Sequence, residues 1–175
     1  MLFRSDLLDI IEKHPYKEGL ECNIDLKSLH NIKTELKQIH DMIGLTCFKN
    51  DLLDQLLYFM QGLHINKDHD YKHLVIYGPP GTGKTQVAKL VGLMYSKLGI
   101  LKNGVFKKVT RNDLVAGYLG QTALKTRDVI KECIGGVLFI DEAYALGNED
   151  KRDSFSKECI DTLDRKSTRL NSSHT

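Results

Sequence analysis

The sequence predicts an α/β protein in which a mostly parallel β-sheet lies between layers of helices, a three-layer arrangement. Three observations support this prediction. Short apolar runs typical of buried strands occur at residues 74–77, 105–109 and 137–140. Segments with helical periodicity separate these runs, and alternating strands and helices produce parallel pairing. A glycine-rich segment, residues 78–85, joins the first predicted strand to the helix that follows it.

The glycine-rich segment fits the phosphate-binding pattern G-x-x-x-x-G-K-[ST] at every position. It consists of Gly78, Pro79, Pro80, Gly81, Thr82, Gly83, Lys84 and Thr85. In such a loop, backbone N–H groups and a helix N-terminus surround anionic phosphates. Lys84 is predicted to reach the β- and γ-phosphates, and the Thr85 hydroxyl to bind Mg²⁺. The segment therefore predicts a P-loop nucleotide triphosphatase that uses ATP with Mg²⁺.

The third predicted strand ends in two carboxylates, Asp141 and Glu142. P-loop enzymes need a carboxylate at the end of a neighbouring strand to hold Mg²⁺, and Asp141 fits this role. An adjacent glutamate can orient and deprotonate the attacking water, which makes Glu142 the candidate general base.

Helical periodicity accounts for most of the remaining chain. The predicted helices cover residues 7–11, 26–43, 49–63, 86–98, 112–115 and 124–133. The second is predicted to be one continuous helix with Ile43 on its apolar face. Leu63 and Leu124 are predicted to face inward from later helices. Gly99 is a suitable residue to end the helix after the phosphate loop.

Composition excludes several function classes. The net charge of +2 gives no electrostatic reason to expect nucleic acid or membrane binding. The sequence has no apolar run of membrane-spanning length and no visible secretory signal. The scattered cysteines are typical of reduced thiols in a cytoplasmic protein. His64, His69 and His73 cluster without metal-site spacing, so a polar loop is the better interpretation than a metal site.

Residues 164–174 match, in all eleven positions, one reading frame of a short-read sequencing adapter. We therefore expect residues 164–175 to be an artefact and the authentic sequence to stop at Leu163. The alternative is a genuine disordered tail rich in serine and threonine.

Two longer segments, residues 114–126 and 135–146, resemble AAA+ ATPases, and residues 155–163 continue the resemblance. Within that family, the sequence is most similar to the group containing the red-type Rubisco activase and the stage V sporulation protein K. The resemblance covers about residues 43–163. It divides the chain into an N-terminal helical segment (1–41), a partial AAA+ core (42–163) and the expected artefact (164–175).

The resemblance implies roles for two further segments. Gly44 and Leu45 match the family's segment beside the adenine. Tyr118, Leu119 and Gly120 match the pore loop that grips a polypeptide threaded through a homohexamer. An aromatic residue on a glycine-flanked loop offers a large contact area at low entropy cost. The alternative is a tyrosine packed beneath its loop.

The family's sheet order, 5-1-4-3-2, implies that this chain holds strands one to three only. Strand four, the sensor asparagine, the arginine finger and the helical lid would lie downstream. We therefore expect the 175-residue chain to be a poor ATPase by itself. The helices of residues 1–41 either cap the AAA+ core, which we favour, or recruit a partner.

Three functions remain open at this stage. The leading one is a Mg-ATP-dependent hexamer that remodels a protein substrate. The second is an AAA+ loader or helicase acting on nucleic acid, which Tyr118 and Leu119 disfavour. The third is a nucleotide-binding scaffold with little hydrolysis.

Overall fold

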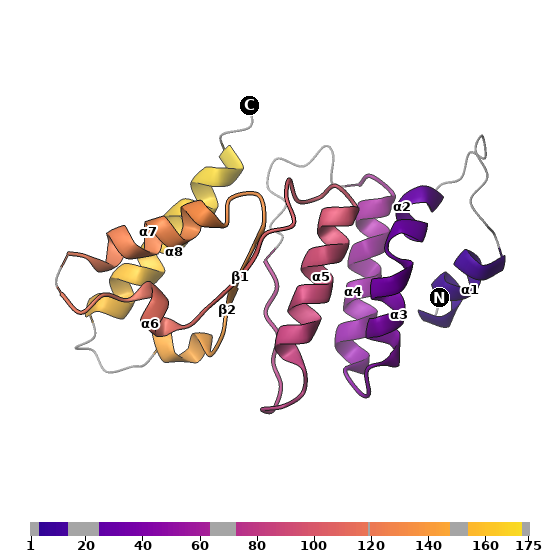
Figure 1. Ribbon diagram of the computed structural model, residues 1–175, viewed down its shortest axis with the longest axis horizontal. Helices are drawn as coiled ribbons and strands as arrows, with labels where there is room; N and C mark the ends of the chain where they lie inside the picture. Colours follow the sequence, from indigo (N-terminus) through magenta and orange to yellow (C-terminus); the bar gives the residue numbers. More distant parts are fainter. Residues whose placement is uncertain (1–3, 14–24, 64–72, 119, 148–153, 173–175) are drawn as a thin grey trace. The chain divides into compact units, whose positions relative to one another are not determined.

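The computed structural model describes residues 4–13, 25–63, 73–118, 120–147 and 154–172. The chain divides into two compact units, Met1–Lys102 and Asn103–Thr175, called here the N-terminal and C-terminal units (Figure 1). The sequence also predicts a turn at residues 16–21 and a polar loop at 67–70. Both lie outside the described residues, as do Cys22, His64, His69 and Leu119.

The N-terminal unit is built from helices. They are α1 (Arg4–Lys13), α2 (Leu26–Asn31), α3 (Lys33–Asp41), α4 (Thr46–Met60) and α5 (Lys84–Lys97). Figure 1 shows α3, α4 and α5 side by side, and one apolar core joins all five helices. The side chains of Leu29, Ile32, Leu56 and Met94 in this core have no exposed surface. The first three helices therefore bury their apolar faces against α4 and α5.

The single helix predicted for residues 26–43 is wrong, because the structure breaks it at Ile32. Asp25 begins α2 by accepting the N–H groups of Lys27 and Ser28, at 3.0 and 3.2 Å. Ile32 then adopts φ −98° and ψ 6°, outside helical geometry, while its side chain stays fully buried. The break preserves the apolar periodicity, which is why the pattern concealed it.

Apolar positions beyond the ends of helices, or on their outer faces, also differ from the prediction. Ile43 is fully exposed because α3 ends at Asp41, and Leu63 is 53% exposed because α4 ends at Met60. Leu124 lies within α7 (Thr122–Glu132) but is 57% exposed. Apolar periodicity predicts a buried side chain only where the helix extends to that residue and another element covers that face of the helix.

The buried strand predicted at residues 74–77 is also absent from the described structure. Leu74, Val75 and Tyr77 are 41%, 70% and 85% exposed, and the segment has no strand geometry. A strand requires a neighbouring backbone, and the sheet of the described residues has two strands only, both in the C-terminal unit. In the expected sheet order, the neighbours of this segment are strands four and five.

The C-terminal unit contains the sheet. Its elements are β1 (Phe106–Val109), α6 (Arg111–Leu114), α7, β2 (Val137–Ile140), the 3₁₀ helix η1 (Ala143–Leu146) and α8 (Ser154–Ser172). β1 and β2 are parallel, with Phe106 opposite Val137 and Val109 opposite Ile140. This pairing confirms the predicted adjacency of the second and third strands. The hydrophobic core of this unit consists of Val109, Leu114, Val129, Leu146 and Cys159.

Gly136 permits the close approach that starts this parallel pair. A Cβ atom at this position would lie 2.4 Å from the Val105 carbonyl oxygen, closer than a side chain tolerates. The Val137 N–H then donates to the same carbonyl, at 2.7 Å. The glycine pair before β2 is therefore a structural requirement of the strand contact.

Two further predictions concern cysteines and membrane spans. Cys47, Cys133 and Cys159, the cysteines within the described ranges, are free thiols, and burial raises the pKa of Cys133 and Cys159. Among the helices of the described segments, none is both long enough and apolar enough to cross a bilayer.

Candidate functional site

The glycine-rich segment forms a tight loop at the N-terminus of α5. Gly81 and Gly83 have φ angles of 78° and 79°, which favour glycine, and α5 begins at the next residue, Lys84. The Thr82 hydroxyl closes the loop by donating to the Pro79 carbonyl at 2.8 Å. The free N–H groups of the first helical turn therefore follow directly after the loop.

The Lys84 side chain crosses back over the loop that precedes it. Its ammonium donates to the carbonyls of Gly78 and Pro79, both at 2.8 Å. Thr85 follows in the first turn of α5 and is half-buried. A positive charge, a hydroxyl and a helix N-terminus therefore lie together, a combination suited to polyphosphate.

The structure also brings residues 42–45 to the phosphate loop. A Cβ atom at Gly83 would lie 2.9 Å from Met42 Cε, so the Met42 side chain rests against the loop backbone. Gly44 and Leu45 follow with left-handed φ angles of 76° and 57°. The predicted adenine segment and the predicted phosphate loop are thus neighbours within one unit.

Asp141 and Glu142 lie in the C-terminal unit, at the carboxyl end of β2. The Asp141 N–H donates to the Val109 carbonyl at 2.8 Å and extends the pairing beyond Ile140. One Asp141 carboxylate oxygen, Oδ1, accepts the Glu142 N–H at 3.1 Å. Glu142 itself has a left-handed φ of 54°, an uncommon conformation for this residue type, and is the N-cap residue of η1.

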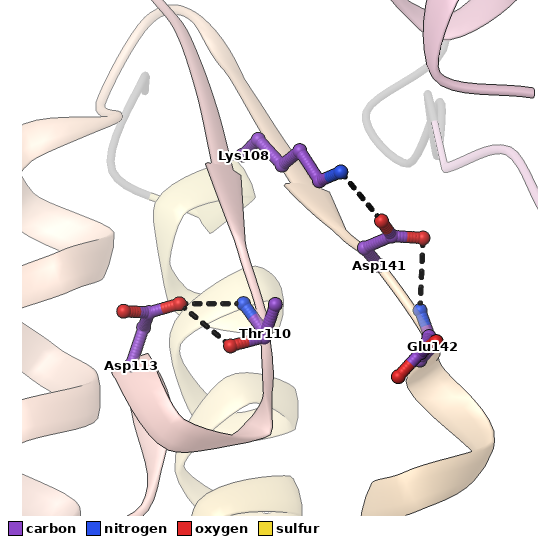
Figure 2. Close-up of polar contacts among 5 residues, drawn as sticks. All are labelled: Lys108, Thr110, Asp113, Asp141 and Glu142. Carbon is purple, nitrogen blue, oxygen red and sulfur yellow. Dashed lines mark hydrogen bonds and ion pairs between the residues drawn. The ribbon is translucent and has the colours of Figure 1, made fainter.

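Figure 2 shows a contact to Asp141 that sequence reasoning missed. The Lys108 ammonium, from β1, lies 2.6 Å from Asp141 Oδ2. The sequence offered only a weak signal, because this pairing depends on the strand register. Asp141, predicted to bind Mg²⁺, is thus already paired with a cation of the same chain.

The end of β1 is closed by a second carboxylate (Figure 2). Asp113 accepts the backbone N–H and the hydroxyl of Thr110, each at 2.8 Å. The backbone N–H of Thr110 is the main cause that lowers the Asp113 pKa. This capping box fixes the turn from β1 into α6.

The predicted pore-loop residues follow α6. Tyr118 is 74% exposed and Gly120 has a φ of 76°, so Tyr118 does not pack beneath its loop here, and its pore-loop role stays a prediction. The N-terminal end of the loop is held by α7. The Lys125 ammonium donates to the Asn112 and Val115 carbonyls at 2.6 and 3.0 Å, and the Thr126 hydroxyl donates to the Leu114 carbonyl at 3.0 Å.

The predicted site residues thus fall into two groups. The phosphate loop and residues 42–45 belong to the N-terminal unit, whereas Asp141, Glu142 and the Tyr118 loop belong to the C-terminal unit. Within the described residues, no group of three or more His, Cys, Asp or Glu side chains is arranged to hold a metal ion.

The family model described as "ATPase family associated with various cellular activities (AAA)" matches residues 74–174. The chain belongs to the AAA family of ATPases. A "Putative cfxQ-like protein R730" of Acanthamoeba polyphaga mimivirus is 42% identical over 146 residues, which cover 83% of this chain and 36% of that protein. This AAA chain therefore spans less than half of that relative's length.

Two cellular relatives are similar to this AAA chain to nearly the same degree. The stage V sporulation protein K of Bacillus subtilis is 38% identical over 85% of this chain and 47% of its own length. The chloroplastic "Ribulose bisphosphate carboxylase/oxygenase activase" of Cyanidioschyzon merolae is 38% identical over 79% of this chain and 44% of its own length. These relatives confirm the resemblance to the group predicted from the sequence.

Proposed function

We propose that this AAA chain is part of an ATP-hydrolysing remodeller that acts on a protein substrate as a homohexamer. The observation that supports it most directly is the phosphate loop at the N-terminus of α5, with Lys84 lying across it. The similarity to a protein named an activase of another enzyme supports a protein substrate. The chain spans less than half the length of each of the three relatives described above, so we propose the hexamer and the protein substrate for a longer parent protein.

The donor set fits Mg-ATP. Mg²⁺ prefers oxygen ligands, and a hydroxyl from Thr85 with a carboxylate from Asp141 would supply them. When bound there, the ion would supply positive charge that stabilises the phosphates during transfer. Lys84 and the loop backbone of residues 78–83 would bind the phosphates, and Gly44 and Leu45 the adenine. Glu142 would take a proton from the attacking water.

Replacement of Lys84 tests the nucleotide site. We expect Lys84→Ala to weaken Mg-ATP binding by roughly 100-fold, because a charged hydrogen-bond donor to phosphate contributes about 1.5–3 kcal/mol. Lys89→Ala is the matched control, since Lys89 is an exposed lysine further along the same helix. Titration calorimetry of the full chain measures both variants. Equal affinities for the two variants would exclude Lys84 from the site.

Replacement of Tyr118 tests the threading proposal. We expect Tyr118→Ala in the parent protein to lower the rate of substrate unfolding at least about fivefold, because an aromatic grip contributes about 1 kcal/mol or more. ATP hydrolysis should stay within about twofold of the unmodified rate. Tyr144→Ala is the control, because Tyr144 is equally exposed at 75%, against 74% for Tyr118. Unfolding that survives the Tyr118 change would remove the pore-loop assignment.

Two other functions are distinguishable from this one. A nucleic-acid loader or helicase would require basic groups around the loop, and the aromatic Tyr118 favours polypeptide. A scaffold with little hydrolysis is disfavoured by the presence of Lys84, Thr85, Asp141 and Glu142 together.

We further propose that the protein is cytoplasmic, that residues 164–175 are an adapter artefact, and that the 175-residue chain alone hydrolyses ATP poorly. Leu74, Val75 and Tyr77, which lead into the phosphate loop and are exposed without a strand partner among the described residues, support the last point.

A further inference from the structure

A buried lysine lies beneath the segment that touches the phosphate loop. Lys49, in the first turn of α4, is only 3% exposed. Burial of an ammonium group is costly unless nearby acceptors replace the lost water. The Lys49 ammonium donates to the His40 carbonyl at 3.1 Å and also to the Met42 carbonyl. These acceptors lie at the C-terminal end of α3, where the helix dipole attracts a positive charge.

This contact closes the connection between α3 and α4 into a compact loop. Lys49 reaches back from α4, across residues 42–45, to the end of α3. The Leu45 carbonyl accepts the Lys49 N–H at 2.9 Å, so backbone and side chain of one residue hold both ends of the loop. Gly44 and Leu45, which are both left-handed, lie between these two anchors.

Met42 links this anchor to the phosphate loop. Its carbonyl accepts the buried ammonium, while its side chain rests against Gly83, the N-cap residue of α5. A change at Lys49 therefore acts on residues 42–45 without touching the phosphate loop directly.

We propose that Lys49 is a positioning residue that holds residues 42–45 in place to contact the nucleotide base. Lys49 then contributes to the binding free energy of the nucleotide base, whereas the binding free energy of the phosphates does not depend on it. This inference rests on the proposed ATP site. A purely structural role in the helix core would instead affect all ligands of the site alike.

The test compares two ligands of the full chain, Mg-ATP and Mg-tripolyphosphate, which lacks the base and ribose. We expect Lys49→Met to weaken binding of ATP about tenfold and of tripolyphosphate less than about twofold. Lys49→Arg, which keeps the buried charge, should recover most of the ATP affinity. Dissociation constants are measured by titration calorimetry, at a temperature where circular dichroism shows each variant to be folded.

Lys97→Met is the matched control for destabilisation. The Lys97 ammonium also donates to a carbonyl at a helix end, Asn31 at 3.1 Å, and to Glu35 at 2.7 Å, but these contacts lie in α2 and α3. Its loss should leave the ratio of the two affinities unchanged. Met42→Ala, at a half-buried position, tests the same link if Lys49→Met does not fold. It should also lower the affinity for ATP selectively.

The outcomes separate this inference from the proposed function. If the unmodified chain binds neither ligand, the proposed function fails and the inference fails with it. If it binds both equally tightly, the adenine assignment and the inference are both overturned. If it prefers ATP but Lys49→Met, or Met42→Ala in its place, keeps that preference, the inference alone is overturned. A selective loss of ATP affinity, recovered by arginine, supports it.

Discussion

Replacing Glu142 with glutamine in the parent protein is expected to slow ATP hydrolysis by about 100- to 10,000-fold, the usual contribution of a general base. ATP binding should change little, because the Glu142 contacts that the structure shows use its backbone: the N–H donates to Asp141 and the carbonyl accepts the Ala145 N–H. Glutamine keeps that N–H and the size of the side chain but cannot accept the proton. Phosphate release and nucleotide binding, measured in parallel, check both parts.

The control for this change is Glu132→Gln, at the end of α7 in the same unit. Glu132 is exposed and pairs with Lys107, away from Asp141. Its loss should leave hydrolysis within about twofold of the original rate. If Glu142→Gln hydrolyses ATP as fast as this control, Glu142 is not the base. If the unmodified protein and Glu142→Gln both bind ATP and both hydrolyse it only slowly, the nucleotide-binding scaffold becomes the better-supported function.

Replacing Leu56 with alanine should lower the free energy of unfolding of the N-terminal unit by about 3 kcal/mol. Leu56 lies in α4 with no exposed surface, in the core shared by all five helices. The loss combines reduced burial with the cavity that remains. Urea unfolding followed by circular dichroism measures the change.

Leu63→Ala is the matched control for the core. Periodicity alone predicts that Leu56 and Leu63 both face inward, but Leu63 is 53% exposed. Its replacement should change the unfolding free energy by about 0.5 kcal/mol or less. Equal effects at the two positions would contradict the helix boundary at Met60 and the core described above.

Predictions from the sequence succeeded where a local pattern determines the outcome. The α5 helix and its end before Gly99 follow from a loop motif, an apolar period and a glycine cap, although α5 begins at Lys84, two residues before the predicted start. The β1–β2 pair follows from two apolar runs and the expected sheet order. They failed at residues 74–77 and at Ile43, because burial there depends on elements that do not cover these residues.

In the candidate site too, residues in a local sequence pattern were predictable, whereas residues that depend on tertiary contacts were not. The phosphate loop and the carboxylate pair are recognisable because their chemistry requires fixed residue types at fixed spacing. Lys49 and Lys108 carry no such spacing, and each finds its partner through tertiary contact or strand register. The sequence does offer one signal for Lys49. It lies three residues before Leu52 and seven before Leu56, which places a lysine on the apolar face of the predicted helix.

Because the Lys108 ammonium already pairs with Asp141, any cation that bound to this carboxylate would replace that ammonium. If Asp141 binds Mg²⁺, as proposed above, the ion would have to displace the Lys108 ammonium group. Both partners are partly exposed, at 46% and 28%, and such an ion pair contributes about 1 kcal/mol at most. The displacement therefore lowers the affinity for the ion by no more than about fivefold. On the proposed function, Lys108 would be a reversible counter-charge: it neutralises the Asp141 carboxylate while no metal ion is bound and gives way to a doubly charged ion.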